Sequence, residues 1–101
     1  MMTYPFEWDS GNLSKLELVR KSGRLIYREE IESVFEDEDL ITNKSYLDPI
    51  SGEQRYIATG RGNQGQVLSV VFVVRNGGIR VFNVWRTKGT KFKQYNEKRT
   101  S

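Results

Sequence analysis

The chain has 101 residues, 37% of them hydrophobic and 12% aromatic, which fits one small domain over residues 1–101 and leaves no room for a second. It contains no cysteine and no histidine, which excludes disulfides, thiolate or imidazole metal sites and the commonest general base. No apolar run has the ~18 residues of a membrane span, and the first residues do not resemble a signal peptide. We therefore expect a cytoplasmic protein that does not contact the membrane. A domain this small buries only about 60–65% of its unfolded surface, so a second copy, as a homodimer, would stabilise it.

The net charge of +3 conceals an uneven distribution of charges along the chain. Residues 1–53 carry twelve Asp/Glu and six Lys/Arg, whereas residues 54–101 carry ten Lys/Arg and one Asp/Glu. Such a basic half favours a polyanionic partner, because each phosphate contact releases condensed counterions. The alternative is that the two halves fold together and their charges offset each other.

The densest acidic run comprises Glu29, Glu30, Glu32, Glu36, Asp37, Glu38 and Asp39. The ligands of a metal site would have to converge, whereas these residues follow one another along a predicted helix and loop. We therefore interpret the run as solvated surface.

The first half of the chain predicts an extended arm and two helices. Residues 3–8 are aromatic and contain a proline, which suits an edge strand or an arm. Apolar residues at helical spacing predict a helix over 11–21, which Gly23 ends, and a second helix over 28–35. Residues 42–53 are rich in turn-forming residues and predict a loop.

The second half predicts strands and a short helix. Alternation predicts strands over 55–61, 66–75 and 79–86, and the middle one is apolar on both faces, which is typical of a central strand. Asn76-Gly77 is a strong hairpin signal, and the basic segment 87–99 predicts a short helix. The fold class is therefore α+β: two N-terminal helices, a three- or four-stranded antiparallel sheet and a short C-terminal helix.

Strand alternation places arginines on one face of this sheet. A two-residue turn at Asn76-Gly77 would put Arg80 opposite Val73, Arg86 opposite Val67 and Val84 opposite Ser69, whereas a turn one residue later would shift this register. The other face is the predicted core face, with Ile79, Val81 and Trp85 beside Leu68, Val70, Phe72 and Val74.

The preceding strand adds two more arginines to this row. If the arginine-bearing faces coincide, one concave surface is flanked by Arg55, Arg61, Arg80 and Arg86. A guanidinium donates two parallel hydrogen bonds to a phosphate, so the row predicts phosphate recognition. Alternatively, the arginines solvate the outer face and cover apolar surface with their stems.

Several motifs resemble the BrnT family of toxins. Phe6-Glu7-Trp8-Asp9 resembles the FEWD-type motif with which members of that family begin. Ser51-Gly52-Glu53-Gln54-Arg55 is similar to its G-E-x-R element, and Trp85-Arg86, with Tyr95 nine residues later, resembles its closing segment. The resemblance runs from about residue 6 to residue 96.

The resemblance implies a RelE-like ribonuclease fold and a toxin of a type II toxin–antitoxin pair that cuts RNA without a metal or other cofactor. It also implies a small DNA-binding antitoxin, BrnA, as partner, with operator DNA bound only through the assembled complex. Most relatives carry Lys-His-Gly after the first helix, where this chain has Arg20-Lys21-Ser22-Gly23, and often a glutamate where Lys91 stands. A catalytically degenerate module that binds RNA or the antitoxin on the same fold therefore stays an alternative.

Metal-free RNA cleavage needs a base, an acid and cations that stabilise the phosphorane. The residues that we predict for these roles are Arg55, Arg80 and Arg86 as cations, Lys15, Lys21 or Glu53 as base, and Tyr95 as a donor or stacking ring. The predicted RNA-binding residues are Arg61, Lys88, Lys91 and Lys93. Alternatively, Lys15 is a solvated helix residue, Glu53 caps a loop or pairs with Arg55, and Tyr95 anchors the terminal helix in the core. A third hypothesis is a purely structural protein whose basic sheet receives an acidic antitoxin segment.

Overall fold

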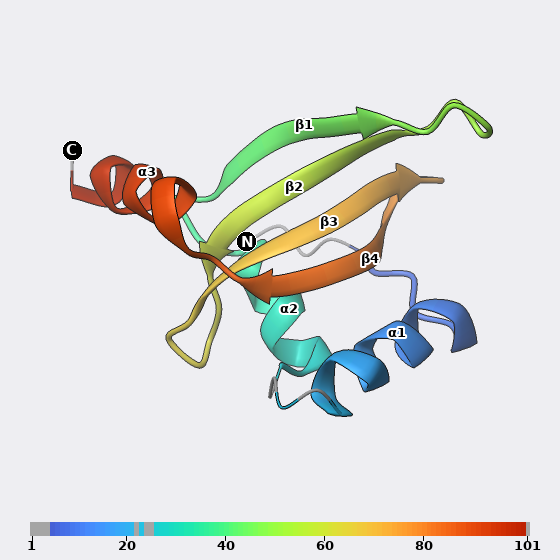
Figure 1. Cartoon of the computed structure of the whole chain (residues 1–101), viewed down its shortest axis with the longest axis horizontal. Coiled ribbons are helices and arrows are strands. Elements are labelled where there is room, and N and C mark those ends of the chain that lie inside the picture. Colours follow the sequence, from blue (N-terminus) through green and yellow to red (C-terminus); the bar gives the residue numbers. More distant parts are fainter. Residues whose placement is uncertain (1–4, 22, 24–25, 101) are drawn as a thin grey trace.

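A computed structural model of the chain describes residues 5–21, 23 and 26–100, and contains three helices and four strands (Figure 1). The elements in chain order are α1 (Ser10–Lys21), α2 (Arg28–Val34), β1 (Ile41–Leu47), β2 (Gln54–Arg61), β3 (Val67–Arg75), β4 (Gly78–Arg86) and α3 (Gly89–Thr100). This is the α+β order that the sequence predicts. Among the described residues, no helix is long and apolar enough to cross a membrane.

The sheet is antiparallel throughout, with strand order β1-β2-β3-β4. Helices α1 and α2 cover one face, and α3 lies at the end of the sheet where β2 and β4 end (Figure 1). Most of the opposite face, which we call the open face, carries no helix. On this face Thr59, Ser69 and Val73 are buried, whereas Arg55, Arg61, Arg80 and Phe82 are partly exposed.

The hydrophobic core lies between the sheet and the first two helices. Its buried members are Leu16, Ile26, Ile31, Val34, Phe35, Ala58, Leu68, Val70, Phe72, Ile79, Val81 and Val84. Phe35 packs edge to face against Phe6 and Phe72, with ring centroids 5.3 and 5.1 Å apart. Gly60 lets α2 lie flush on β2, because a Cβ there would meet the Val34 carbonyl oxygen at 3.0 Å. The turn that follows β2 covers residues 62–66.

Local signals account for the boundaries of several elements. The Asp9 carboxylate accepts hydrogen bonds from the backbone N–H groups of Gly11 and Asn12, which caps α1. Gly23 ends the helix with φ of 94°, and the Asn76-Gly77 turn has φ of 51° and 76°, as a tight hairpin turn requires. Arg80 pairs with Val73, as this turn predicts.

The arm before α1 is extended over the residues that the structure describes. Pro5 accepts a hydrogen bond from the Ile79 N–H, and Glu7 donates one to the Ile79 carbonyl, so the arm adds to the edge of β4. Residues 3 and 4 of the predicted arm lie outside the described residues.

The loop predicted over 42–53 is wrong in its first half, where β1 pairs with β2. Strand β1 is an edge strand whose side chains are nearly all exposed, so its sequence has no hydrophobic alternation and only backbone pairing holds it in place. The remainder is a turn, in which the Asp48 N–H donates to the Glu53 carbonyl.

The register predicted for the end of β4 is also wrong, because the strand contains a β-bulge. Phe72 pairs with Val81 and Val71 pairs with Asn83, so Phe82 is an extra residue. As a result Arg86 lies opposite Leu68 instead of Val67, on the face of the helices. Likewise Ser69 lies opposite Trp85 instead of Val84, so Trp85 leaves the core face. Val74, predicted for the core, is 57% exposed at the end of β3.

The acidic run is not purely solvated surface, as we had interpreted it. Glu30 is only 2% exposed, because α2 packs against the 62–66 turn. Glu32 accepts a hydrogen bond from the Trp8 indole at 2.7 Å, and Asp37 binds Tyr95. Among the described residues, no three acidic side chains converge in a group that could hold a metal ion.

Candidate nucleic-acid interface

Three of the predicted site residues meet around the ring of Phe82. Arg55 lies 4.1 Å from the ring centroid, Lys15 5.8 Å and Arg80 5.9 Å, although they come from β2, α1 and β4. We call Phe82 and these three cations the Phe82 cluster. Arg80 and Phe82 share the open face by ordinary strand alternation, and the packing of α1 and β2 beside β4 brings Lys15 and Arg55 to the ring. The ring face attracts each cation, and the positive charges gathered around it can attract an anion such as a phosphate.

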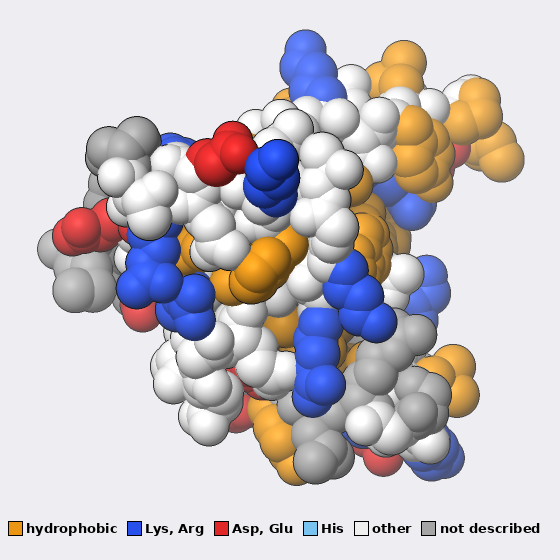
Figure 2. Space-filling model, turned by 60° about the vertical axis from the view of Figure 1, so that its left-hand side comes forward, with side chains coloured by type: hydrophobic (Ala, Val, Ile, Leu, Met, Phe, Trp, Pro, Cys, Tyr) orange, Lys and Arg blue, Asp and Glu red, His pale blue; other side chains and the backbone are white. Residues whose placement is uncertain are grey.

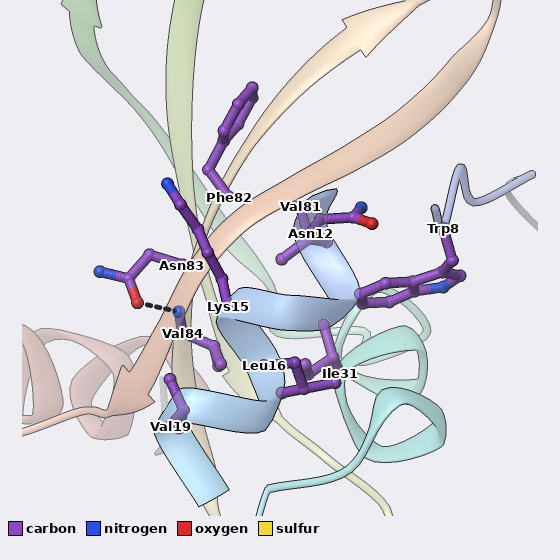
Figure 3. Close-up of a pocket in the computed structure, with 10 residues that line it drawn as sticks. All are labelled: Trp8, Asn12, Lys15, Leu16, Val19, Ile31, Val81, Phe82, Asn83 and Val84. Atoms are coloured by element: carbon purple, nitrogen blue, oxygen red, sulfur yellow. Dashed lines mark hydrogen bonds between the residues drawn. The ribbon is translucent and has the colours of Figure 1, made fainter. Parts of the chain in front are cut away.

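Lys15 reaches this cluster from the helical side of the sheet. Figure 3 shows its side chain extending from α1 across β4 toward the side on which Phe82 lies. The small pocket beneath it, between α1 and β4, has a volume of about 10 Å³. That volume is about enough for one water molecule. A ligand of the Phe82 cluster that is larger than water therefore cannot enter this pocket.

Carboxylates accompany the arginines of this region. Arg80, whose side chain is 14% exposed, donates to Asp9 Oδ1 at 3.0 Å and to Glu7 at 3.2 Å. The hydrogen bonds from Arg80 lower the pKa of Asp9 from 3.8 to about 2. Arg55 lies 3.7 Å from Asp48. Lys15 is the member of the cluster for which no carboxylate partner occurs among the described residues.

Glu53 pairs with an arginine, but not with the one we predicted. It accepts two hydrogen bonds from Arg75, at 2.6 and 2.7 Å, and these lower the pKa of its carboxyl. The hairpin between β1 and β2 brings Asp48, instead of Glu53, to Arg55. With both oxygens engaged, Glu53 is a poor candidate for a base. Lys21 lies at the exposed end of α1, and the structure records no contact between it and the Phe82 cluster.

A second group of predicted residues lies at the other end of the sheet, beside α3. A groove of about 260 Å³, which we call the α3 groove, is lined by Arg61, Gly65, Gln66, Val67, Arg86, Thr87 and Phe92. The Arg61 guanidinium donates to the Gly65 carbonyl at 2.7 Å, which holds it against the 62–66 turn. Arg86 is exposed at the end of β4 and still reaches the groove, although the bulge has moved it off the face of Arg80.

The positive charge around this groove is not neutralised by neighbouring carboxylates. Within the described part of the chain, no ion pair joins a carboxylate to Arg86, Lys88, Lys91 or Lys93. Figure 2, in which the end that carries α3 is turned forward, shows Lys and Arg side chains spread over much of this surface. This end of the molecule therefore carries the strongest electrostatic attraction for a polyanion.

Between the Phe82 cluster and the α3 groove, three side chains of β2 have a buried polar atom without a hydrogen-bond partner. Arg55, Thr59 and Arg61 lie on the open face of the strand, and a buried side-chain atom of each, Nε, Oγ1 and Nε respectively, has no hydrogen-bond partner in the structure. Unpaired buried polar atoms are costly and uncommon in proteins. All three atoms lie beneath the surface of β2, where the packing leaves their hydrogen-bonding capacity unused.

Tyr95 lies inside the protein. It is 1% exposed, and its hydroxyl donates a hydrogen bond to Asp37 Oδ2, which also accepts the Arg61 backbone N–H at 2.7 Å. Burial and this hydrogen bond raise the pKa of Tyr95. Burial opposes ionisation of Asp37, but hydrogen bonds from Arg61 and Tyr95 lower its pKa overall. The ring is not available to stack on an RNA base, which favours the alternative that Tyr95 anchors α3.

A larger groove lies next to the α3 groove, and the sequence analysis did not single out its residues as a site. Glu30, Tyr27 and Gln66 line it together with Arg86. One signal in the sequence could have found Glu30: it precedes the core residue Val34 by four positions, which places a carboxylate on the buried face of α2.

The comparisons with known proteins give no match. No family model matches the chain, and no curated protein matches its sequence. The BrnT-like motifs therefore stay a prediction, and the function must be argued from the two regions described above.

Proposed function

We propose that this protein is a metal-independent endoribonuclease of the BrnT kind, which binds RNA across the open face of its sheet and cuts it at the Phe82 cluster. The observation that carries this proposal is the pair of cations at the two ends of the open face of β2, Arg61 at the α3 groove and Arg55 on the Phe82 ring. The two arginines are six residues apart, which corresponds to ~20 Å along a strand. An RNA strand following β2 would meet cations at both ends of this face.

Each region has a distinct role in this proposal. Among the described residues no carboxylate pairs with Arg86, Lys88, Lys91 or Lys93, so these cations supply affinity for the phosphate backbone. At the other end, the Lys15 amine accepts the proton of the 2′-hydroxyl group, whose oxygen bonds to phosphorus. The bond from phosphorus to the 5′-oxygen breaks, and that oxygen takes a proton from water. The guanidinium of Arg55, already aligned by its stack on Phe82, donates hydrogen bonds to the phosphorane.

Two substitutions separate these roles. In an assay with end-labelled RNA in excess EDTA, Lys15→Met should lower kcat by about 100-fold or more, with little change in KM, because it removes the base. Arg86→Ala should chiefly raise KM and reduce the log–log salt slope of binding by about 0.7, the contribution of one phosphate contact on a single strand. The bulge is the reason that we expect Arg86→Ala to weaken binding without abolishing scission.

Lys44→Met is the matched control for Lys15→Met. Lys44 is an exposed lysine of β1 opposite Tyr56, on the other face of the sheet, so the substitution removes the same charge away from the open face. It should leave kcat unchanged. Cleavage by Lys15→Met at the wild-type rate would refute the role of this residue.

A non-catalytic module that binds RNA, or an acidic segment of a BrnA-like antitoxin, is the second candidate. Two observations favour it. Arg55 and Arg80 already pair with carboxylates of this chain, so less of their charge is available for catalysis. Val73, opposite Arg80, is only 1% exposed, as expected if arginine stems cover apolar surface. This candidate expects RNA binding that weakens with salt and no strand scission by the folded wild-type protein.

A further inference from the structure

The groove that contains Glu30 has the composition of a binding site. It has a volume of about 480 Å³, and we call it the Glu30 pocket. It is lined by Tyr27, Glu29, Glu30, Asn63, Gln64, Gln66 and Arg86. Gln66 and Arg86 also line the α3 groove, so the two are continuous. An RNA strand bound at the α3 groove would therefore pass the mouth of this pocket.

Glu30 is a buried carboxylate with unused hydrogen-bonding capacity. Its Oε2 accepts one hydrogen bond from the Gln66 amide at 2.9 Å, while its Oε1 has no partner in the structure. The residue is 2% exposed, and Gly62 lies so close to it that an added Cβ would sit 3.0 Å from its Cγ. A carboxylate has about four acceptor positions, so this fixed side chain lacks donors.

The other lining groups suit a flat ring attached to a phosphate. Tyr27 is 47% exposed, and Arg20 stacks on its ring at 5.3 Å from the centroid, which leaves its other side for a second planar group. Arg86 has no carboxylate partner among the described residues and can bind an anion. The exposed side chains of Asn63 and Gln64 lie at the opening and can rotate aside to admit a ligand.

We propose that the Glu30 pocket binds a guanine base of the RNA, which rests on the proposed binding of RNA to this surface. Among the four RNA bases, guanine presents two adjacent donors, N1–H and the N2 amino group, which match the two oxygens of a carboxylate. Adenine, uracil and cytosine each place an acceptor beside a donor on the same edge. In this arrangement Tyr27 stacks on the base and Arg86 contacts its phosphate.

The test compares three oligonucleotides that differ in one base. The probes are fluorescein-labelled hexamers with 2′-O-methyl groups, which remove the attacking hydroxyl, and they contain one guanine, inosine or adenine in an otherwise adenine sequence. Fluorescence anisotropy should show the guanine hexamer bound about tenfold tighter or more than the adenine one. Inosine lacks the N2 amino group and should lose most of this preference.

Two variants locate the preference at Glu30. Glu30→Gln replaces one acceptor oxygen with a donor amide and should abolish the discrimination between guanine and adenine. Glu36→Gln makes the same change of charge at an exposed side chain just beyond α2 that does not line the pocket, and should keep the discrimination. If Glu30→Gln does not fold, the affinities of the wild-type protein for the three hexamers still show whether guanine is preferred. Competition by 5′-GMP but not by 5′-AMP would support recognition of the base itself.

The outcomes separate this inference from the proposed function. Equal affinity of the wild-type protein for all three hexamers would overturn the guanine pocket while RNA binding stands. A wild-type preference for guanine that persists in Glu30→Gln would overturn the role of Glu30. If none of the hexamers binds, both the pocket and the proposed function fail.

Discussion

Replacing Tyr95 with phenylalanine tests whether this side chain holds α3 in place or takes part in chemistry on RNA. The hydroxyl is buried and donates to Asp37, a hydrogen bond to a charged acceptor of a kind that contributes about 1.5–3 kcal/mol. Asp37 retains the backbone N–H groups of Arg61 and Asp39 in the variant, so its charge is still solvated by the protein. We therefore expect Tyr95→Phe to lower the free energy of unfolding by ~1–2 kcal/mol.

Urea unfolding followed by circular dichroism measures this loss, and Tyr46→Phe is the matched control. Tyr46 is 50% exposed and its hydroxyl forms no hydrogen bond in the structure, so its removal should not change stability. Because the pKa of Tyr95 is raised in the folded state, its stabilisation is complete below the ordinary pKa of 10.0 and is lost as the pH rises through the folded value. The difference in unfolding free energy between the wild-type protein and Tyr95→Phe should therefore shrink as the pH rises above 10.0.

Assays of RNA binding and cleavage test whether the Tyr95 hydroxyl takes part in the chemistry. Folded Tyr95→Phe should bind and cut RNA as the wild type does, since the hydroxyl faces Asp37 and not the open face. Two results would refute the reasoning: an unfolding free energy equal to that of the wild type, or loss of scission by a variant shown to be folded.

Two further predictions concern stability. Asp9→Asn should lower the urea midpoint at pH 7 and flatten its dependence on pH, because the pKa of Asp9 falls from 3.8 to about 2 on folding. Its stabilisation is thus present above 3.8 and is lost as the pH falls toward 2; parallel pH curves for the two proteins would contradict this. Gly60→Ala should lower the free energy of unfolding by ~1–3 kcal/mol, since its Cβ would lie 3.0 Å from both the Val34 carbonyl oxygen and Leu40 Cδ1. A melting temperature equal to that of the wild type would show that α2 moves away from β2 at no cost.

Several features of the fold followed from short stretches of sequence. Asn76-Gly77 predicts a hairpin because both positions need positive φ, and the observed angles of 51° and 76° agree. The pairing of Arg80 with Val73 follows directly from that turn. The buried faces of α1 and α2 follow from apolar residues at helical spacing, as Leu16, Ile31 and Val34 show.

Strand β1 and the bulge at Phe82 could not be obtained in the same way. An edge strand held only by backbone hydrogen bonds to β2 leaves no apolar pattern, so residues 41–47 look like a loop. The bulge inserts one residue without a sequence signal, and from that point every side chain of β4 changes face.

For the candidate site, the sequence by itself determined which charges are available, and the tertiary structure decided which of them meet. Lys15, Arg55 and Arg80 are dispersed along the chain, and they surround one ring because α1, β2 and β4 pack together at Phe82. Likewise, helical spacing places Glu30 on the face of Val34, but only the packing of α2 against the 62–66 turn buries this carboxylate and leaves that of Glu29 in solvent. Residue types and turn angles are local properties, whereas burial and the pairing of charges depend on elements far apart in the sequence.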